Sequence, residues 1–95
     1  MAVKKYEAVV IFKSDEAAFR EAKEFLRKEL ETAQMTVVKE DDMGDRLLAT
    51  PIGKNDRGHY ILYTLETEPV QLHVVDRSLK LKPEILKFLF VRLDV

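Results

Sequence analysis

Side chains able to do acid–base or metal chemistry are few and scattered in this sequence of 95 residues. Its two histidines, His59 and His73, are not spaced as a ligand pair on one helix, and there is no cysteine. A zinc site needs imidazole or thiolate ligands at short, defined spacings. We therefore expect no metal site and no cofactor.

A run of carboxylates at Glu40, Asp41, Asp42 and Asp45 could attract a cation. It lacks the alternating spacing and central glycine of a calcium loop, so a solvated acidic turn explains it better. The sequence also contains no nucleophile elbow, phosphate-binding loop or dinucleotide fingerprint. These absences indicate that the protein is not an enzyme.

Positive and negative side chains nearly balance, with 16 Lys and Arg against 17 Asp and Glu and a net charge of −1. Six of the acids fall within residues 15–31, whereas most cations lie elsewhere. A neutral total can therefore hide a basic surface that meets phosphates, although scattered solubilising cations explain the composition equally well. The longest apolar run, residues 8–12, is far too short to span a membrane, and we expect a cytoplasmic protein.

The hydrophobic pattern predicts elements in the order β-α-β-β-α-β. The expected strands cover residues 4–12, 35–52, 59–66 and 85–93, a hairpin loop covers 53–58, and the helices cover 15–33 and 68–79. Gly44 inside the second strand indicates a bulge, and Pro51, which has no amide hydrogen, places that strand at a sheet edge. The order predicts an α+β ferredoxin-like sandwich as a single domain over residues 1–95, with a four-stranded antiparallel sheet and both helices on one face.

The expected strands hold more apolar residues than one buried face needs. Residues 8–12 and 88–91 are consecutively apolar, and residues 60–63 are nearly so. Because side chains alternate in direction along a strand, some of these must point away from the helices. A contiguous exposed apolar patch usually marks a partner site, so we expect docking of another protein or self-association. Shielding of that face by loops or chain ends is the alternative.

Two activities found on this type of fold have little support in the residues. Small acyl-phosphate hydrolases hold phosphate with an arginine in a glycine-rich loop after the first strand, but here that loop is Lys13-Ser14-Asp15. RNA-binding sheets carry aromatic residues in the RNP1 pattern, and residues 57–63 keep only its beginning. We interpret that partial match as coincidental.

Several separated blocks of the sequence resemble one family, the bacterial small-subunit ribosomal protein S6 family. Residues 42–52 (DMGDRLLATPI) and 58–62 (GHYIL) are similar to its W-G-x-R-x-L-A-Y-P-I and G-H-Y-x-L segments. Residues 4–7 (KKYE) look like its R-R-Y-E opening, and residues 85–93 (ILKFLFVRL) look like its V-L-R-Y-L-V-V-R closing strand. The chain departs from the pattern at Met43, Leu47 and Thr50, where Trp, Arg and Tyr are common, and at Asp45, where a neutral or basic residue is frequent.

The resemblance implies a structural constituent of the small (30S) ribosomal subunit. Such a protein would bind the central domain of 16S rRNA together with ribosomal protein S18, with no membrane and no small-molecule substrate. The expected RNA contacts are Lys4, Lys5, Arg46, Lys54, Arg57, Lys87 and Arg92. The expected partner-binding residues of the sheet are Tyr6, Phe88 and Phe90, unless they face inward as core. The alternative function is an interaction or regulatory module that self-associates through its open sheet face, followed by a small phosphate-handling enzyme.

Overall fold

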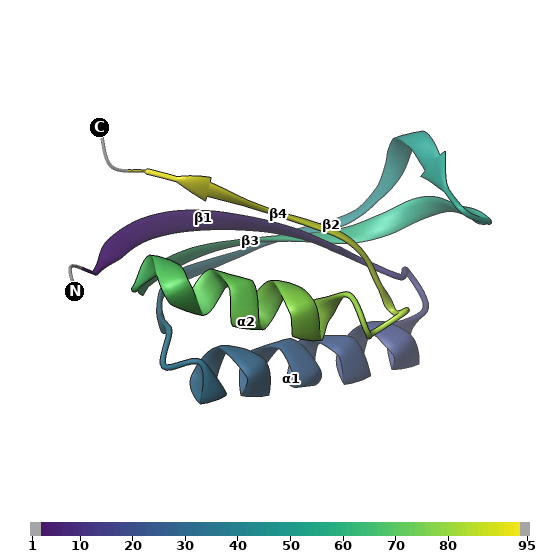
Figure 1. Ribbon diagram of the computed structural model, residues 1–95. Coiled ribbons are helices and arrows are strands. Elements are labelled where there is room, and N and C mark those ends of the chain that lie inside the picture. Colours follow the sequence, from purple (N-terminus) through teal and green to yellow (C-terminus); the bar gives the residue numbers. More distant parts are fainter. Residues whose placement is uncertain (1–2, 94–95) are drawn as a thin grey trace.

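In the computed structural model, which describes residues 3–93, the chain forms six elements in the predicted order (Figure 1). The strands are β1 (Lys4–Phe12), β2 (Thr36–Ile52), β3 (Asn55–Thr67) and β4 (Ile85–Arg92), and the helices are α1 (Glu16–Thr32) and α2 (Pro69–Leu79).

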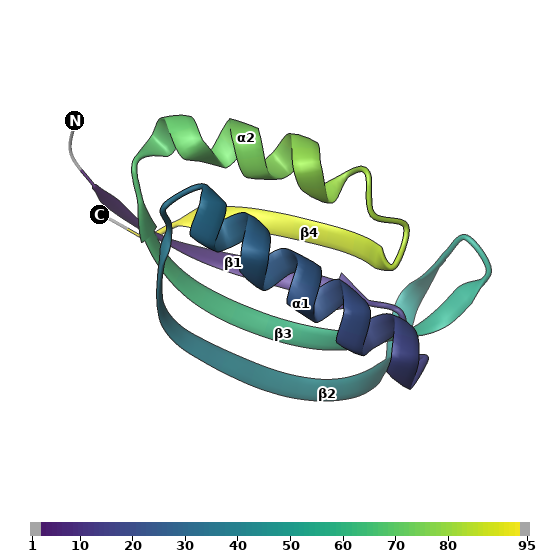
Figure 2. The same ribbon diagram turned by 90° about the horizontal axis from the view of Figure 1, so that it is seen from below.

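The strands form one antiparallel sheet in the order β2-β3-β1-β4. Both helices lie against the same face of this sheet, and β2 runs along its edge, for most of its length outside the area that the helices cover (Figures 1 and 2). The predicted ferredoxin-like α+β sandwich is therefore confirmed, and one face of the sheet carries no helix.

Helix α1 is capped by Asp15, whose carboxylate accepts a hydrogen bond from the backbone N–H of Ala18 at 3.0 Å. Such a cap typically contributes ~1 kcal/mol. Ala22, Leu26 and Leu30 recur at steps of four along the helix and are at most 2% exposed. They form an apolar stripe that shares one core with Ala8, Val10 and Phe12, which are every second residue of β1.

Helix α2 begins at Pro69, as expected, because proline fits the first helical turn, where its missing N–H leaves nothing unpaired. Val75 and Leu79 bury this helix in the same core. The loop that follows is fastened to α1 by Lys82, whose ammonium lies 2.7 Å from Glu21 Oε1. This ion pair links α1 to the loop between α2 and β4.

Strand β2 is confirmed as an edge strand with a bulge at Gly44. Its register with β3 shifts between Asp42 and Gly44, and Gly44 has a φ of +82°, which residues with a side chain rarely adopt. The predicted loop over residues 53–58 is wrong in its extent, since β3 begins at Asn55 and only Gly53 and Lys54 form the turn. Gly53 has a φ of +60°, and a two-residue hairpin turn requires such a positive φ at its first residue.

Beyond the sheet, β2 and β3 continue as a hairpin arm, residues 46–58, which rises on the side away from the helices (Figure 1). Its base leaves no room for a side chain at Gly58, because a Cβ there would lie 2.4 Å from Ile11 Cγ2 and 3.4 Å from Leu48 Cδ2. The arm is thus seated on the end of β1 by close packing.

Replacing Gly58 with alanine should lower the free energy of unfolding by about 1–3 kcal/mol, because Ile11 is branched at Cβ and cannot easily turn its methyl away. Urea unfolding followed by circular dichroism measures this change. In an Ile11→Ala background, where that methyl is absent, the added cost of Gly58→Ala should fall below about 1 kcal/mol. An equal cost in both backgrounds would show that the two residues do not collide.

Candidate functional site

The face of the sheet opposite to the helices, here called the open face, carries a row of apolar side chains. The strand register places Val9 of β1 between Leu62 of β3 and Leu89 of β4, and Val91 lies two residues further along β4. Leu89 is 57% exposed and Val91 is 43% exposed. We call these four residues the apolar patch. The expectation of an apolar face without helices is confirmed.

The arm covers one end of the open face. Ile11 is the second-last residue of β1, at the end of the strand next to the arm, and it is only 8% exposed. Arm residues 48–52 lie over it, and together with Tyr60 and Lys87 they line an open hollow of about 290 Å³. Shielding by a loop, the alternative expectation, therefore applies to this end of the face but not to the apolar patch.

Tyr6, Phe88 and Phe90 lie on the helix-covered face, so their assignment to the open sheet surface is wrong. Tyr6 is 4% exposed, and the two phenylalanines pack against the core. In the register Phe88 pairs with Val10 and Phe90 with Ala8, both of which face the helices. The inward-facing alternative is what the structure shows, and the apolar residues of β4 that reach the open face are Leu89 and Val91.

Three of the seven cations expected to contact RNA lie on the open face: Lys5, Arg46 and Lys87. Lys87 pairs in register with Ile11 near the arm, whereas Lys5 lies near the other end of β1. Arg46 belongs to the edge strand β2, on the far side of the sheet from β4. These cations flank the apolar patch on different sides and do not form one cluster.

The other four cations lie elsewhere. By their register, Lys4 and Arg92 occupy the helix side of β1 and β4. Lys54 is exposed in the turn at the tip of the arm, and Arg57 lies on the arm itself. The structure thus distributes the expected RNA contacts around the rim of the sheet and along the arm.

Asp45 joins three segments of the chain at the base of the arm. Its carboxylate accepts one hydrogen bond from the hydroxyl of Ser14, in the loop after β1, and another from Arg57 Nε at 2.8 Å. The Ser14 hydrogen bond, followed by that of Arg57, holds the pKa of Asp45 below its ordinary value. Arg46 is held in a similar way, because its Nε donates to the carbonyl of Met43 at 3.1 Å.

The acidic residues 40–45 belong to strand β2, so the expected solvated turn is wrong. By their register Glu40, Asp42 and Asp45 lie on the helix side of the sheet and Asp41 on the open face, and each carboxylate meets a different basic partner. The pairs beside that of Asp45 are Glu40 with Lys23, Asp41 with Lys39 and Asp42 with His59. Within residues 3–93, no three His, Asp or Glu side chains come together as metal ligands.

His59 connects α1 to the arm end of the sheet. Its ring stacks on Phe19 with centroids 3.8 Å apart, and its Nε2 lies 2.5 Å from Asp42 Oδ1. Since a carboxylate only accepts, the imidazole donates. Burial raises the pKa of Asp42, but the His59 hydrogen bond, the backbone N–H of Gly44 and nearby positive charge together bring the pKa below its ordinary value.

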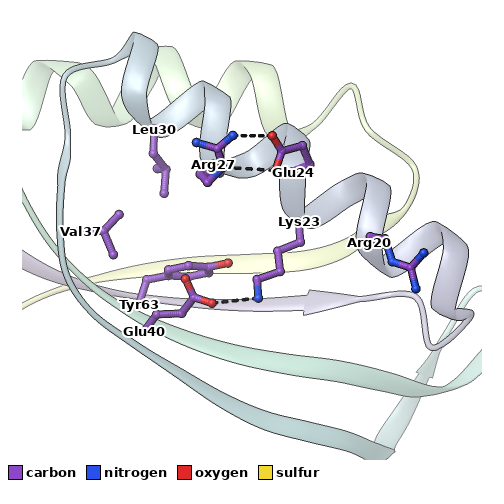
Figure 3. A pocket seen from close by; sticks show the side chains of 8 residues that line it. All are labelled: Arg20, Lys23, Glu24, Arg27, Leu30, Val37, Glu40 and Tyr63. Atoms are coloured by element: carbon purple, nitrogen blue, oxygen red, sulfur yellow. Dashed lines mark hydrogen bonds and ion pairs between the residues drawn. The ribbon is translucent and has the colours of Figure 1, made fainter.

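A groove of about 620 Å³ lies between α1 and the edge strand β2 (Figure 3). Lys23 reaches across it to Glu40, with 3.0 Å between nitrogen and oxygen, and Arg27 pairs with Glu24 on its own helix. The hydroxyl of Tyr63 points into the groove, and burial raises its pKa above the ordinary value for tyrosine. The chain's own carboxylates thus neutralise these cations, and the groove offers neither charge for a phosphate nor a catalytic acid–base pair.

Over residues 5–92 the chain matches the protein family described as Ribosomal protein S6. The chain belongs to the ribosomal protein S6 family. The sequence blocks that carried the resemblance fall within the matched range, apart from Lys4 and Leu93 at its ends.

Two similar proteins are the small ribosomal subunit proteins bS6 of Treponema pallidum and Treponema denticola. The first is 34% identical over 89 residues, which cover 94% of this chain and 96% of the relative. The second is 30% identical over 92 residues, which cover 97% and 99%. The crystal structure of 30S ribosomal protein S6 from Thermotoga maritima has the same fold, with a TM-score of 0.87 at 22% identity over 97% of this chain and 89% of that one.

Membership of the ribosomal protein S6 family gives the chain a structural role in the small ribosomal subunit. The family is not enzymatic, so the phosphate-handling enzyme is excluded. The two helices of the described part of the chain lack the length and apolar character needed to cross a membrane.

The low pKa of Asp42 makes its contribution to stability depend on pH. A carboxyl with a lower pKa in the folded than in the unfolded chain stabilises the fold above its unfolded value of about 3.9, and this contribution is lost as the pH falls through the folded value. Asp42→Asn should therefore flatten the decline in unfolding free energy as the pH falls below about 4.

Urea unfolding at several pH values tests this, with Asp56→Asn as the matched control. Asp56 is exposed on the arm and makes no side-chain hydrogen bond or ion pair within residues 3–93. The same decline in the Asp42 variant as in the control would contradict a stabilising His59–Asp42 contact.

Proposed function

We propose that this protein binds the central domain of 16S rRNA together with ribosomal protein S18, which docks on the apolar patch of the open face. The observation that carries the proposal is the row of uncovered apolar side chains with cations on the same face. Acting as part of the small ribosomal subunit, the protein would work in the cytoplasm.

Docking of a protein partner is supported by the free energy that is gained when the apolar patch is removed from water. Covering a side chain such as Leu89, which is 57% exposed, is worth about 1–2 kcal/mol. The hollow of about 290 Å³ under the arm adjoins the patch and has room for an apolar side chain of the partner. A surface of this kind, apolar at its centre and charged at its rim, is typical of protein interfaces.

The proposed RNA contacts are the exposed and half-buried cations of the strands and the arm: Lys4, Lys5, Arg46, Lys54, Arg57, Lys87 and Arg92. Their spread around the rim suits contacts to the phosphates of a folded RNA, which position a protein without reading bases. Because each contact alone is weak and salt-sensitive, docking of the protein partner would provide much of the affinity.

Self-association is the second candidate, and the same apolar patch favours it. A second copy of the chain would cover Leu89 and Val91 as a partner protein would, through a symmetric interface. The apolar patch cannot bind S18 and a second copy of the chain at the same time. In sedimentation experiments, self-association therefore predicts a dimer of the protein alone, whereas the first candidate predicts a complex with S18.

Leu89→Glu should weaken binding to purified S18 by more than about tenfold, because it buries a charge at the centre of the proposed interface. The far-ultraviolet circular dichroism spectrum should not change, since Leu89 lies outside the core. The matched control is Leu81→Glu, in the loop before β4 and 80% exposed, which should bind like the wild type. Isothermal titration calorimetry measures both.

Undiminished S18 binding by Leu89→Glu would remove the apolar patch as the docking surface. Dimerisation of the wild type that this variant abolishes, without any affinity for S18, would establish self-association instead.

Changing Lys4 and Lys5 together to alanine should weaken binding to a 16S central-domain fragment and lower the slope of log K against log salt by about 0.7 per lost phosphate contact. Filter binding at several salt concentrations, with S18 present, measures both quantities. The control removes the same charge from the solvent side of α1 by Arg20→Ala with Lys28→Ala. Unchanged affinity and slope would exclude the two lysines as RNA contacts. Equal losses of affinity and slope in the control would show that the two lysines act only through the net charge of the protein.

A further inference from the structure

We infer that Asp45 is a positioning residue for phosphate recognition, which holds the Arg57 guanidinium by one edge and leaves its other edge for an RNA phosphate. The inference rests on the proposed RNA-binding function and states how one of its contacts is built.

The geometry of Arg57 leaves four of its five N–H donors for a ligand. Its Nε donates to Asp45 Oδ2 at 2.8 Å, and its side chain is 50% exposed. Within residues 3–93, the two terminal nitrogens, Nη1 and Nη2, donate no hydrogen bond. A pair of parallel N–H groups at the end of a planar guanidinium matches two oxygens of one phosphate.

Asp45 is itself held in place, which makes it an effective support. One carboxylate oxygen accepts the hydrogen bond of Ser14, and the other accepts that of Arg57. The three residues come from the loop after β1, from β2 and from β3, so the support joins three segments of the fold. Arg46 also has its Nε occupied, by the Met43 carbonyl, so two anchored guanidiniums stand at the base of the arm.

The Asp45 carboxylate has two opposite effects on a phosphate bound by Arg57. Its charge repels the phosphate, but Asp45 is 41% exposed and water screens that repulsion. Its hydrogen bond orders a long side chain before binding, so less conformational entropy is lost when the phosphate arrives. The second effect is the larger one in our inference, so removing Asp45 should weaken RNA binding although it makes the protein more positive.

Asp56 supplies the matched control, because it stands next to Arg57 in the sequence and carries the same charge but makes no side-chain contact within residues 3–93. Filter binding to a 16S central-domain fragment, with S18 present, compares Asp45→Ala with Asp56→Ala. We expect Asp45→Ala to weaken binding by about threefold to tenfold and Asp56→Ala to leave it unchanged or tighten it slightly.

Two further variants separate positioning from charge. Asp45→Asn loses the charge but keeps an oxygen that can accept from Arg57 Nε, so it should regain most of the lost affinity. In an Arg57→Ala background, Asp45→Ala should have no further effect. In the free protein, nitrogen-15 spectra should show an Arg57 Nε–H that exchanges with water slowly in the wild type and faster in Asp45→Ala.

Tighter binding by both Asp45→Ala and Asp45→Asn would overturn the inference and make Asp45 a competing anion. The inference would also be overturned if Asp45→Ala weakened RNA binding in the Arg57→Ala background. It would likewise be overturned if Asp45→Ala left the exchange rate of the Arg57 Nε–H unchanged. In each of these cases the wild type still binds RNA, and the proposed function stands. If the wild type does not bind the fragment at all, the proposed function fails and the inference with it.

Discussion

The architecture depends on one mismatch: the strands β1, β3 and β4 carry apolar residues on both faces, but the two helices cover only one face of the sheet. On the buried face, alternating residues of β1 pack with the apolar stripes of both helices, and together they form the core. On the other face the arm bends over Ile11 and shields one end. Leu89 and Val91 remain exposed beside the half-buried Val9 and Leu62, and an exposed apolar patch of this kind favours contact with the surface of a partner.

Charge in this protein is organised locally, so its near-neutral total conceals different surfaces. Along α1 and β2 the carboxylates are bound to basic groups of the same chain, as in the Lys23–Glu40 pair and the His59–Asp42 contact. The Lys23–Glu40 pair crosses the groove beside the edge strand and connects α1 to the sheet, whereas the His59–Asp42 contact joins β3 to β2. At the base of the arm a similar pair has a different consequence, because the Arg57 guanidinium keeps donors that point to no other group of residues 3–93.

The spacing of apolar residues and the positions of proline and glycine predicted the fold well, because both depend on interactions that are local in the sequence. The steps of four in α1 gave its buried stripe, while Pro51 and Gly44 located the edge and the bulge of β2. The faces of β4 could not be predicted, since the consecutive apolar residues 88–91 have no period and only the pairing with β1 decides their direction. The hydrogen bond between Ser14 and Asp45 joins residues 31 positions apart, so only the folded chain reveals the support of Arg57.

In the function that we propose, the open face holds a protein partner while the surrounding cations hold RNA. The decisive measurement is the affinity of the unaltered protein for a 16S central-domain fragment, across salt concentrations and with and without purified S18. We predict tight binding that requires S18 and weakens steeply as salt rises. Equal affinity with and without S18, or no binding in either condition by a protein that circular dichroism shows to be folded, would contradict the account.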